Sequence, residues 1–456
     1  MTTLVAYLDD IQHRLDALAR HHHVPGAVLA VSQGQETLDF ATGVINRGTG
    51  VETTTDSVFQ IGSNTKLMTT TLIMQLVDAG QVGLDEPVRR YVPDFELAER
   101  GAAAKITLRH LLTHTSGIDG DVFTDTGRGD DCLEKYVALL ADVRQNHPPG
   151  ATMSYCNAGF VLAGRVIEKL TGATWDAAMR ERLFTPLGLR HTVTLPEEAL
   201  LFRTAVGHVE TDPLTTARAW GIPRSQGPAG VICASAADVL AFARMHLSGG
   251  LAADGTRILS AASAQAMTEF QVELPDKLTH RDSWGLGWMR FGWGGQRLIG
   301  HDGGTIGQAA FLRMLPDAGL AVVLLTNGGQ AGDLYQELYR EIFAKLAGVH
   351  VPSPPTPSAT PAEVDGQRYA GVYERAGQRL EVLADGDGLL LRSTILGPLA
   401  ELERKPVAEY RMRPAGPDLF LIRAPGAQTW SVMTFYELPT GEKYLHLGAR
   451  ATPKVS

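Results

Sequence analysis

The chain has 456 residues, of which 44% are hydrophobic and 20% are charged, and its formal net charge is −9. The length exceeds that of one ordinary domain, and the composition is that of a globular protein with a large core. The negative charge argues against a nucleic-acid partner, which would require a basic face. The three cysteines lack metal-ligand spacing and cannot all pair, so we expect free thiols in a reducing cytoplasm.

The N-terminal stretch, residues 1–23, alternates apolar and charged side chains and lacks the apolar segment of a signal peptide. It predicts an amphipathic helix that covers the domain. No apolar run approaches transmembrane length, so we expect a cytoplasmic protein with no membrane partner. The run at residues 21–23, three histidines, could indicate a metal site. Successive side chains diverge and no acidic partner is near in sequence, so a helix end is favoured and no metal is expected.

Residues 58–80 contain the motif around which the rest of the chain is arranged. A short apolar run precedes a Ser-x-x-Lys motif at residues 63–66, and a helix with apolar residues at helical spacing follows and ends near Gly80. Ser63 is expected at the start of a buried helix, with Lys66 one turn later on the same face. A lysine whose pKa is lowered by desolvation can take the proton of a serine nucleophile. The alternative is a helix-capping Ser63 beside a solvated Lys66.

A second polar segment ends in Tyr155 and Asn157. A Pro-Pro-Gly turn leads into it, and an apolar helix is expected to begin near Ala158. Because the two side chains are two residues apart in an extended segment, both point the same way. Cys156 lies between them and points the opposite way, so it is interpreted as a core residue and not as a nucleophile.

A third segment, at residues 298–307, contains a His-Asp-Gly motif that begins at His301. It predicts a strand that is followed by a β-hairpin with a marked turn. A helix at 334–347 is expected to pack on the same antiparallel sheet, and residues 64–245 are expected to be mostly helical. The strands expected to join this sheet lie at residues 25–34, 37–43, 296–300, 309–315 and 320–326.

The motifs Ser-x-x-Lys, Tyr-x-Asn and His-x-Gly, in this order and at these separations, resemble those of the penicillin-recognising serine hydrolases. The similarity covers residues 15–348 and is strongest to the branch of class C β-lactamases, D-aminopeptidases and carboxylesterases. It implies an α+β fold in which an antiparallel sheet flanked by helices meets a helical lobe, with the active site between them. β-Lactamases carry Lys-Thr-Gly as the third motif. A histidine at position 301 instead favours esters, thioesters or peptides as substrates.

The resemblance also implies roles for the side chains. Ser63 is the acylated nucleophile, and Tyr155 is the general base because its phenolate becomes accessible beside the Lys66 ammonium. Asn157 orients Lys66 or a substrate amide. His301 replaces the lysine of β-lactamases and can hydrogen-bond Tyr155. Whether Lys66 or Tyr155 takes the serine proton stays open, because their titrations would be coupled.

Backbone groups complete the expected site. The N–H groups of Ser63 and Gly304 are the candidate oxyanion hole. Gly303 is expected to let the substrate backbone approach the strand edge closely, since glycine has no side chain. No cofactor is expected.

Residues 349–366 are rich in proline, serine and threonine and predict a stiff linker. The linker would join a catalytic domain at residues 1–348 to a domain at 367–456, where short apolar runs between turn residues predict a small antiparallel barrel. This domain resembles the lipocalin-like domain appended to some members of the family. Its expected strands lie at residues 371–373, 380–383, 389–392, 419–422, 434–436 and 444–446.

The layout resembles the penicillin-binding-protein-type thioesterases, which release nonribosomal peptides by macrocyclisation. The resemblance implies a peptidyl thioester on the carrier protein of a peptide synthetase, often with a D-residue at the acylated end. Arg450, in the barrel segment most like that family, is expected to contact a carboxylate or carbonyl of the peptide. The alternative for Arg450 is a solvated side chain in the terminus. A D-stereospecific peptidase or carboxylesterase is the alternative function, and intact motifs disfavour a catalytically silent binding protein.

Overall fold

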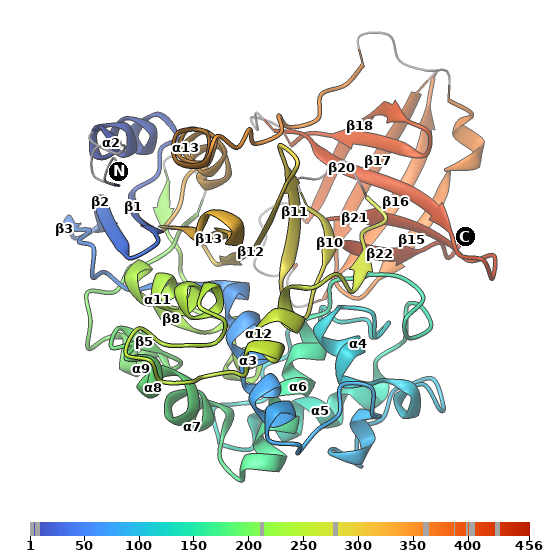
Figure 1. The fold of residues 1–456 in the computed structure, drawn as a ribbon. Coiled ribbons are helices and arrows are strands. Elements are labelled where there is room, and N and C mark those ends of the chain that lie inside the picture. The colour runs from blue at the N-terminus through green and yellow to red at the C-terminus, as the bar shows by residue number, and fades with distance from the viewer. Residues whose placement is uncertain are drawn as a thin grey trace.

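Two β-structures dominate the fold: a nine-stranded antiparallel sheet surrounded by helices, and an eight-stranded barrel formed by the C-terminal part of the chain (Figure 1). The structure is a computed structural model, and it describes residues 4, 10–209, 214–276, 281–358, 364–386, 388–397, 400, 406–424 and 429–456. Among these described residues, no helix is long and apolar enough to cross a membrane.

The nine-stranded sheet has the order β3-β2-β1-β14-β13-β12-β11-β10-β9, with antiparallel neighbours. Ala30 of β1 pairs with Val323 of β14, so strands far apart in sequence form the centre of the sheet. The antiparallel sheet predicted from the sequence is confirmed, and short edge strands extend it. The strands are β1 (Gly26–Gln33), β2 (Glu36–Asn46), β3 (Val51–Glu52), β9 (Val272–Glu273), β10 (Arg281–Trp284), β11 (Met289–Trp293), β12 (Gln296–Thr305), β13 (Gln308–Leu315) and β14 (Leu320–Thr326).

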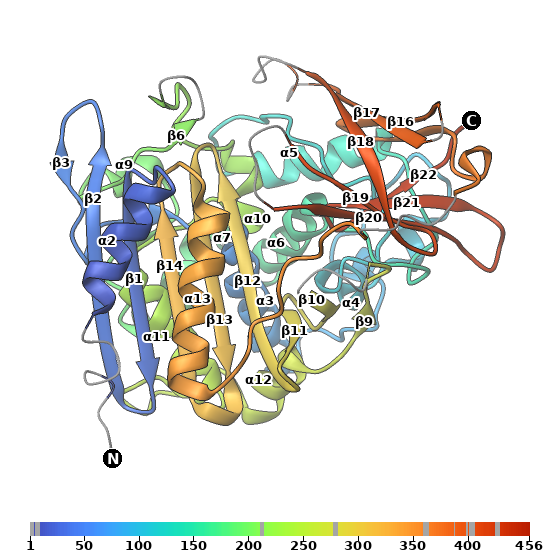
Figure 2. The ribbon, with the colours of Figure 1, turned by 90° about the horizontal axis from the view of Figure 1, so that it is seen from above.

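Both faces of this sheet are covered (Figure 2). Helices α2 (Ile11–His21) and α13 (Ala331–Ala347) lie on one face, and the helical lobe lies on the other. Alternate residues of β1 belong to different hydrophobic clusters: Leu29 packs with α2 and α13, whereas Val28 and Ala30 belong to the core of the lobe. Burial on both faces explains why β1 is a continuous apolar run and not an alternating one.

The helical lobe contains α3 (Thr65–Asp78) and α6 (Asn157–Thr171), which begin at the Ser-x-x-Lys and Tyr-x-Asn motifs. Both helix starts were predicted from the sequence. The other helices are α4 (Leu108–Leu112), α5 (Cys132–Leu139), α7 (Trp175–Met179), α8 (Thr185–Leu187), α9 (Pro196–Ala199), α10 (Gly227–Gly230), α11 (Ala236–Leu247) and α12 (Ala261–Thr268). Small sheets in the same region comprise β4 (Phe59–Gln60), β5 (Thr192–Val193), β6 (His208–Val209), β7 (Thr215–Thr216) and β8 (Cys233–Ala234).

The C-terminal barrel is a meander of eight antiparallel strands that nearly closes on itself. A bridge between Tyr373 and Lys454, and a hydrogen bond of 2.7 Å from the Val455 N–H to the Val372 carbonyl, join the first strand to the last. All six predicted strands are present, and β18 and β22 are additional. The strands are β15 (Gly371–Arg375), β16 (Gln378–Asp385), β17 (Gly388–Ile395), β18 (Val407–Gly416), β19 (Leu419–Ile422), β20 (Ser431–Glu437), β21 (Lys443–Leu447) and β22 (Arg450–Pro453).

The barrel docks on the segment that precedes α6. The Tyr155 N–H donates to the Ala449 carbonyl at 2.8 Å, and the Ala451 N–H donates to Ser154 Oγ at 3.1 Å. The start of β22 therefore runs beside the Tyr-x-Asn motif and bonds to its backbone.

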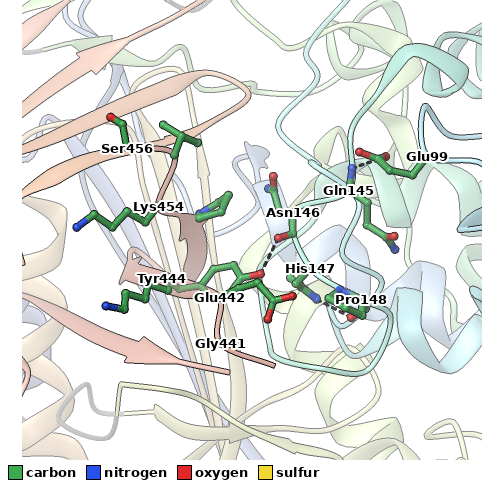
Figure 3. A pocket seen from close by; sticks show the side chains of 13 residues that line it. Glu99, Gln145, Asn146, His147, Pro148, Gly441, Glu442, Tyr444, Lys454 and Ser456 are labelled. Carbon is green, nitrogen blue, oxygen red and sulfur yellow. Dashed lines mark hydrogen bonds between the residues drawn. The ribbon is translucent and has the colours of Figure 1, made fainter. Parts of the chain in front are cut away.

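A second contact joins two residues that line a cavity of about 580 Å³: the Tyr444 hydroxyl donates to the Asn146 carbonyl at 2.9 Å (Figure 3). None of the side chains predicted for the site lines this cavity.

Candidate active site

Ser63 lies in a single 3₁₀ turn, Gly62–Asn64, directly before α3. Its hydroxyl is 3.1 Å from Lys66 Nζ, and Lys66 is fully buried. The solvated Lys66 of the alternative interpretation is therefore excluded. The two residues of the Ser-x-x-Lys motif meet as predicted.

Lys66 has three hydrogen-bond partners among the described residues: Ser63, Asn157 and Ala229. Nζ donates to Asn157 Oδ1 at 2.8 Å and to the Ala229 carbonyl at 2.7 Å, and neither oxygen can donate in return. A neutral amine has two N–H groups for these acceptors, and its lone pair remains for the Ser63 hydroxyl. Burial, reinforced by the charge of Arg450, holds the pKa of Lys66 well below its usual value. The arrangement suits Lys66 as the proton acceptor for Ser63.

Tyr155 lies close to Lys66, whose Nζ is 4.8 Å from the centre of the Tyr155 ring. Burial raises the pKa of Tyr155 above its usual value, although its hydrogen bond with Ser63 acts in the opposite direction. Burial therefore works against the phenolate expected near neutral pH, and the role of Tyr155 as general base stays a prediction. A protonated Tyr155 can still relay a proton between Ser63 and a leaving group.

Asn157 joins Lys66 to a charged network that the sequence did not predict. Its Nδ2 donates to Asp121 Oδ1 at 3.0 Å, while its Oδ1 accepts from Lys66. Asp121 in turn binds Arg450 through Nε at 2.6 Å and Arg375 through a terminal nitrogen at 2.5 Å. Burial raises the pKa of Asp121, but the two arginines outweigh it and hold the pKa below its usual range.

Arg450 therefore lies at the site, as predicted, but with a different partner. Its guanidinium carbon is 5.1 Å from the centre of the Tyr155 ring, and its side chain is 23% exposed. The solvated terminal arginine of the alternative interpretation is thus excluded. Arg450 binds the chain's own Asp121, and contact with a peptide stays a prediction.

His301 lies on β12 and is fully buried near Tyr155, with 6.2 Å between the ring centres. Its Nδ1 is 2.6 Å from the Asp302 carbonyl, and its Nε2 has no hydrogen-bond partner among the described residues. The predicted hydrogen bond to Tyr155 is not formed. Burial, and then the proximity of Lys66, lower the pKa of His301 to about 3, so the ring is neutral. It does not supply the positive charge of the lysine that it replaces.

The glycines after His301 have different surroundings. A Cβ on Gly303 would lie 1.9 Å from the Ile61 carbonyl oxygen, so this glycine is required by the approach of β12 to the 3₁₀ turn. The expectation that its missing side chain makes room for substrate is wrong; its own chain fills that space. A Cβ on Gly304 would have no atom within 4 Å, and the Gly304 nitrogen lies against Gly62 beside Ser63. This position fits the predicted oxyanion hole of the Ser63 and Gly304 N–H groups.

Aromatic rings close the site on the side of Tyr155. His114 stacks on Tyr155 with 4.2 Å between ring centres, and Trp284 packs edge-on against both. His114 has φ 58° and accepts the Cys156 N–H at 3.0 Å, which fixes the backbone beside Tyr155. Cys156 is buried, as expected for a core residue. The sequence analysis did not single out His114. The only signal for it was that the residues around it resemble the family's sequence.

A cavity of about 320 Å³ lies close to the nucleophile. Its lining includes Ile222 and Val231, and Ile222 lies against Gly230, which in turn lies near Gly62. The lining is mixed, because the charged side chains of Asp125, Arg128 and Arg224 lie beside these apolar ones.

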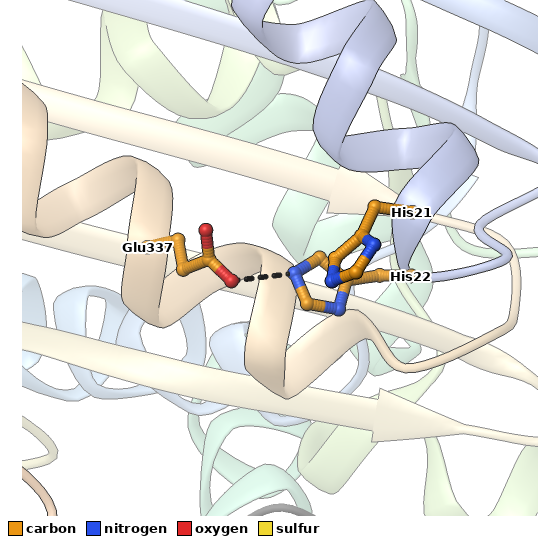
Figure 4. Close-up of side chains that lie close together, drawn as sticks. All are labelled: His21, His22 and Glu337. Atoms are coloured by element: carbon orange, nitrogen blue, oxygen red, sulfur yellow. Dashed lines mark hydrogen bonds and ion pairs between the residues drawn. The ribbon is translucent and has the colours of Figure 1, made fainter.

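The histidine run meets an acidic partner that the sequence analysis overlooked. His21, His22 and Glu337 bring one ligand atom each within 4.8 Å of one another (Figure 4). His22 Nε2 bonds directly to Glu337 at 2.9 Å, and Arg14 also pairs with Glu337. The group joins α2 to α13 and needs no ion to explain it.

Comparisons with known proteins agree with this geometry. The family described as Beta-lactamase matches residues 10–347. The chain is 50% identical to "Penicillin-binding protein 4" of Amycolatopsis lactamdurans over 371 residues, which covers 80% of this chain and 97% of that protein.

Similar solved structures include that of SurE, which has a TM-score of 0.81 and 29% identity and covers 99% of this chain and 100% of its own. The structure of SurE with D-Leu has a TM-score of 0.79 and 30% identity. The D-amino acid amidase of Ochrobactrum anthropi SV3 has a TM-score of 0.62 and 25% identity, and it covers 74% of this chain and 98% of its own. The chain belongs to the beta-lactamase family and is a serine hydrolase of the β-lactamase and penicillin-binding-protein type.

Proposed function

We propose that the protein is an acyl-serine enzyme that releases a peptidyl thioester by head-to-tail macrocyclisation. Ser63 Oγ attacks the thioester carbon while its proton passes to Lys66 Nζ, and the N–H groups of Ser63 and Gly304 hold the oxyanion. The C–S bond then breaks, and the thiol leaves with a proton returned through Lys66 and Tyr155. The amino group of the same peptide attacks the ester, the bond to Ser63 breaks, and Ser63 regains its proton.

The observation that carries the proposal is the docking of β22 against the Tyr-x-Asn motif. Arg450 from this strand covers the Tyr155 ring, so the barrel contributes a cation to the site. A cation at this position suits a peptide carbonyl or carboxylate beyond the scissile bond. The neutral His301 supports an acyl donor other than a β-lactam, whose carboxylate would gain from a positive charge there.

A D-configured residue at the acylated end is proposed from two structural relatives. SurE, which matches this chain over nearly its whole length, was solved with D-Leu, and a D-amino acid amidase matches 74% of this chain. The cavity of about 320 Å³, whose lining is apolar in part, offers space for such a side chain. A carrier protein of a peptide synthetase would present the thioester.

The test compares linear peptides activated at the C-terminus as short carrier-mimicking thioesters, ending in D-Leu or L-Leu. We expect the D-Leu substrate to give mainly the cyclic product, separated from the linear acid by mass. The matched control is the same peptide with an acetylated N-terminus, which has no amine and should accumulate on Ser63 or hydrolyse.

A D-stereospecific peptidase or esterase is the second candidate, because nearly the whole D-amino acid amidase, 98% of it, matches this chain over 74% of its length. Hydrolysis alone, across several free-amine peptides that end in D-residues, would favour this candidate and contradict the cyclase.

A further inference from the structure

One carboxylate, that of Asp121, joins the catalytic residues to the barrel. Only 8% of its side chain is exposed. Its Oδ1 accepts from Asn157 at 3.0 Å and from Arg450 at 3.1 Å, and its Oδ2 accepts from Arg450 at 2.6 Å and from Arg375 at 2.5 Å. Asp121 belongs to the catalytic part, whereas both arginines come from the barrel.

We propose that Asp121, held by Arg375, is a positioning residue that sets Asn157 and through it Lys66 for the acylation of Ser63. The inference rests on the proposed acyl-serine chemistry and extends it, because it makes the barrel a part of the acylation machinery as well as a cover for the peptide.

The geometry leaves Asn157 little freedom. Its amide is held at both ends: Nδ2 donates to Asp121, so Oδ1 must face Lys66 Nζ, at 2.8 Å. Without the carboxylate, the amide could rotate and present N–H groups to Lys66, which would occupy the lone pair needed by Ser63. Asp121 thus determines which end of Asn157 meets the lysine.

The two arginines have different surroundings, and we assign them different roles: Arg375 holds Asp121, and Arg450 is available to a peptide. The Arg375 side chain is 11% exposed and also donates to Gln378 Oε1 at 2.8 Å, so it is fixed within the barrel. Arg450 is more exposed and covers Tyr155, where an acyl chain would lie. Because Asp121 keeps Arg375, Arg450 can turn toward a peptide without leaving a buried carboxylate unpaired.

The test uses a small alkyl fluorophosphonate, which forms a P–O bond to Ser63 and releases fluoride without needing a peptide site. The phosphonylation rate is followed by intact mass for the full-length wild type, Asp121→Asn, Arg375→Gln and Arg375→Lys. We expect Asp121→Asn and Arg375→Gln to slow labelling at least about tenfold, as for a lost charged hydrogen bond. Arg375→Lys should recover part of the rate. The matched control is Arg379→Gln, since Arg379 forms exposed barrel ion pairs away from the site.

The pH dependence of labelling separates positioning from a general structural defect. Asp121 raises the pKa of Lys66 and Arg450 lowers it. As the pH is lowered, Lys66 gains a proton and the labelling rate falls. We expect this fall at a lower pH in Asp121→Asn than in the wild type, and at a higher pH in Arg450→Gln. A structural defect would lower the rate equally at every pH. The other titratable groups that surround Lys66 are Tyr155, Cys156, His114 and His301.

Each outcome decides a different point. A wild type whose Ser63 is not labelled contradicts the proposed function itself. Two results with a labelled wild type overturn the positioning role alone. In the first, Asp121→Asn and Arg375→Gln are labelled as fast as Arg379→Gln. In the second, their labelling is slowed by the same factor at every pH. Circular dichroism and urea unfolding check the fold, and if Asp121→Asn does not fold, Arg375→Gln and its lysine rescue decide.

Discussion

Substitution of Gly303 by alanine tests whether β12 closes on the nucleophile turn as tightly as the structure indicates. Neither Gly303 nor its neighbour Gly304 has a positive φ, so alanine is compatible with the backbone at both positions. The two positions differ in what surrounds them, which makes Gly304→Ala the matched control.

The expected loss of unfolding free energy in Gly303→Ala follows from the contacts of the new methyl group. The new methyl at position 303 would lie 1.9 Å from the Ile61 oxygen, 2.9 Å from its carbonyl carbon and 3.0 Å from Asn64 Nδ2. Van der Waals contact with the oxygen requires a displacement of about 1.5 Å, and the obstacle is backbone that cannot rotate away. Overpacking of this kind costs about 1–3 kcal/mol of unfolding free energy.

The displacement also affects Ser63, two residues from Ile61. A shift of about 1 Å in a catalytic group can slow a reaction on the order of 100-fold, so labelling of Ser63 by the fluorophosphonate should slow by roughly 10- to 100-fold. At position 304 the methyl meets no atom within 4 Å. Gly304→Ala should stay within about 0.5 kcal/mol of the wild type in unfolding free energy.

The assay is urea unfolding followed by circular dichroism, together with the rate of fluorophosphonate labelling. The reasoning is refuted if Gly303→Ala unfolds within about 0.5 kcal/mol of Gly304→Ala and labels at the wild-type rate. That result would mean that β12 and the turn do not approach closely.

Three further predictions concern the site and its titration. Intact-mass spectrometry with a peptidyl thioester should show an acyl adduct on the wild type and none on Ser63→Ala; equal adducts would place the nucleophile elsewhere. Tyr155→Phe and Lys66→Ala should each slow acylation by on the order of 10² or more, and the double variant little further, because both serve one proton; additive losses would indicate independent roles. Burial lowers the pKa of His446 to about 3, and neither ring nitrogen has a partner among the described residues. The unfolded histidine gains a proton below about pH 6.5, so native stability should fall as the pH drops from there. His446→Leu should reduce the slope of unfolding free energy between about pH 4 and 6 by up to about 1.4 kcal/mol per pH unit, and an unchanged slope would contradict a buried neutral ring.

Local signals in the sequence were enough for most of the fold. The starts of α3 and α6 follow from polar motifs placed directly before apolar helical periodicity, and β1, β2, β12, β13 and β14 of the central sheet follow from apolar runs between turn residues, whereas β3, β9, β10 and β11 were not predicted. In the barrel, β18 and β22 were not predicted, because they lack such apolar runs. Their residues are mostly polar, charged or small, and β18 contains Pro414, so neither has the apolar pattern by which a strand is recognised.

The site was predicted in part. Ser63, Lys66, Tyr155 and Asn157 were found because they lie in short motifs whose spacing carries their chemistry. The sequence could not set their proton states. Burial decides that Lys66 loses its proton readily while Tyr155 keeps its own, and burial is a property of the folded chain.

The sequence by itself therefore determined the family, the order of the main elements and the candidate reacting side chains, because these depend on residues close together in the chain. Only the tertiary structure decided which charges surround them. Arg375 and Arg450 are separated from Asp121 by 254 and 329 residues, and no local pattern in the sequence connects them. They meet because the barrel strands pair in one register and dock at one place, and in that buried setting an unpaired carboxylate would be too costly to keep.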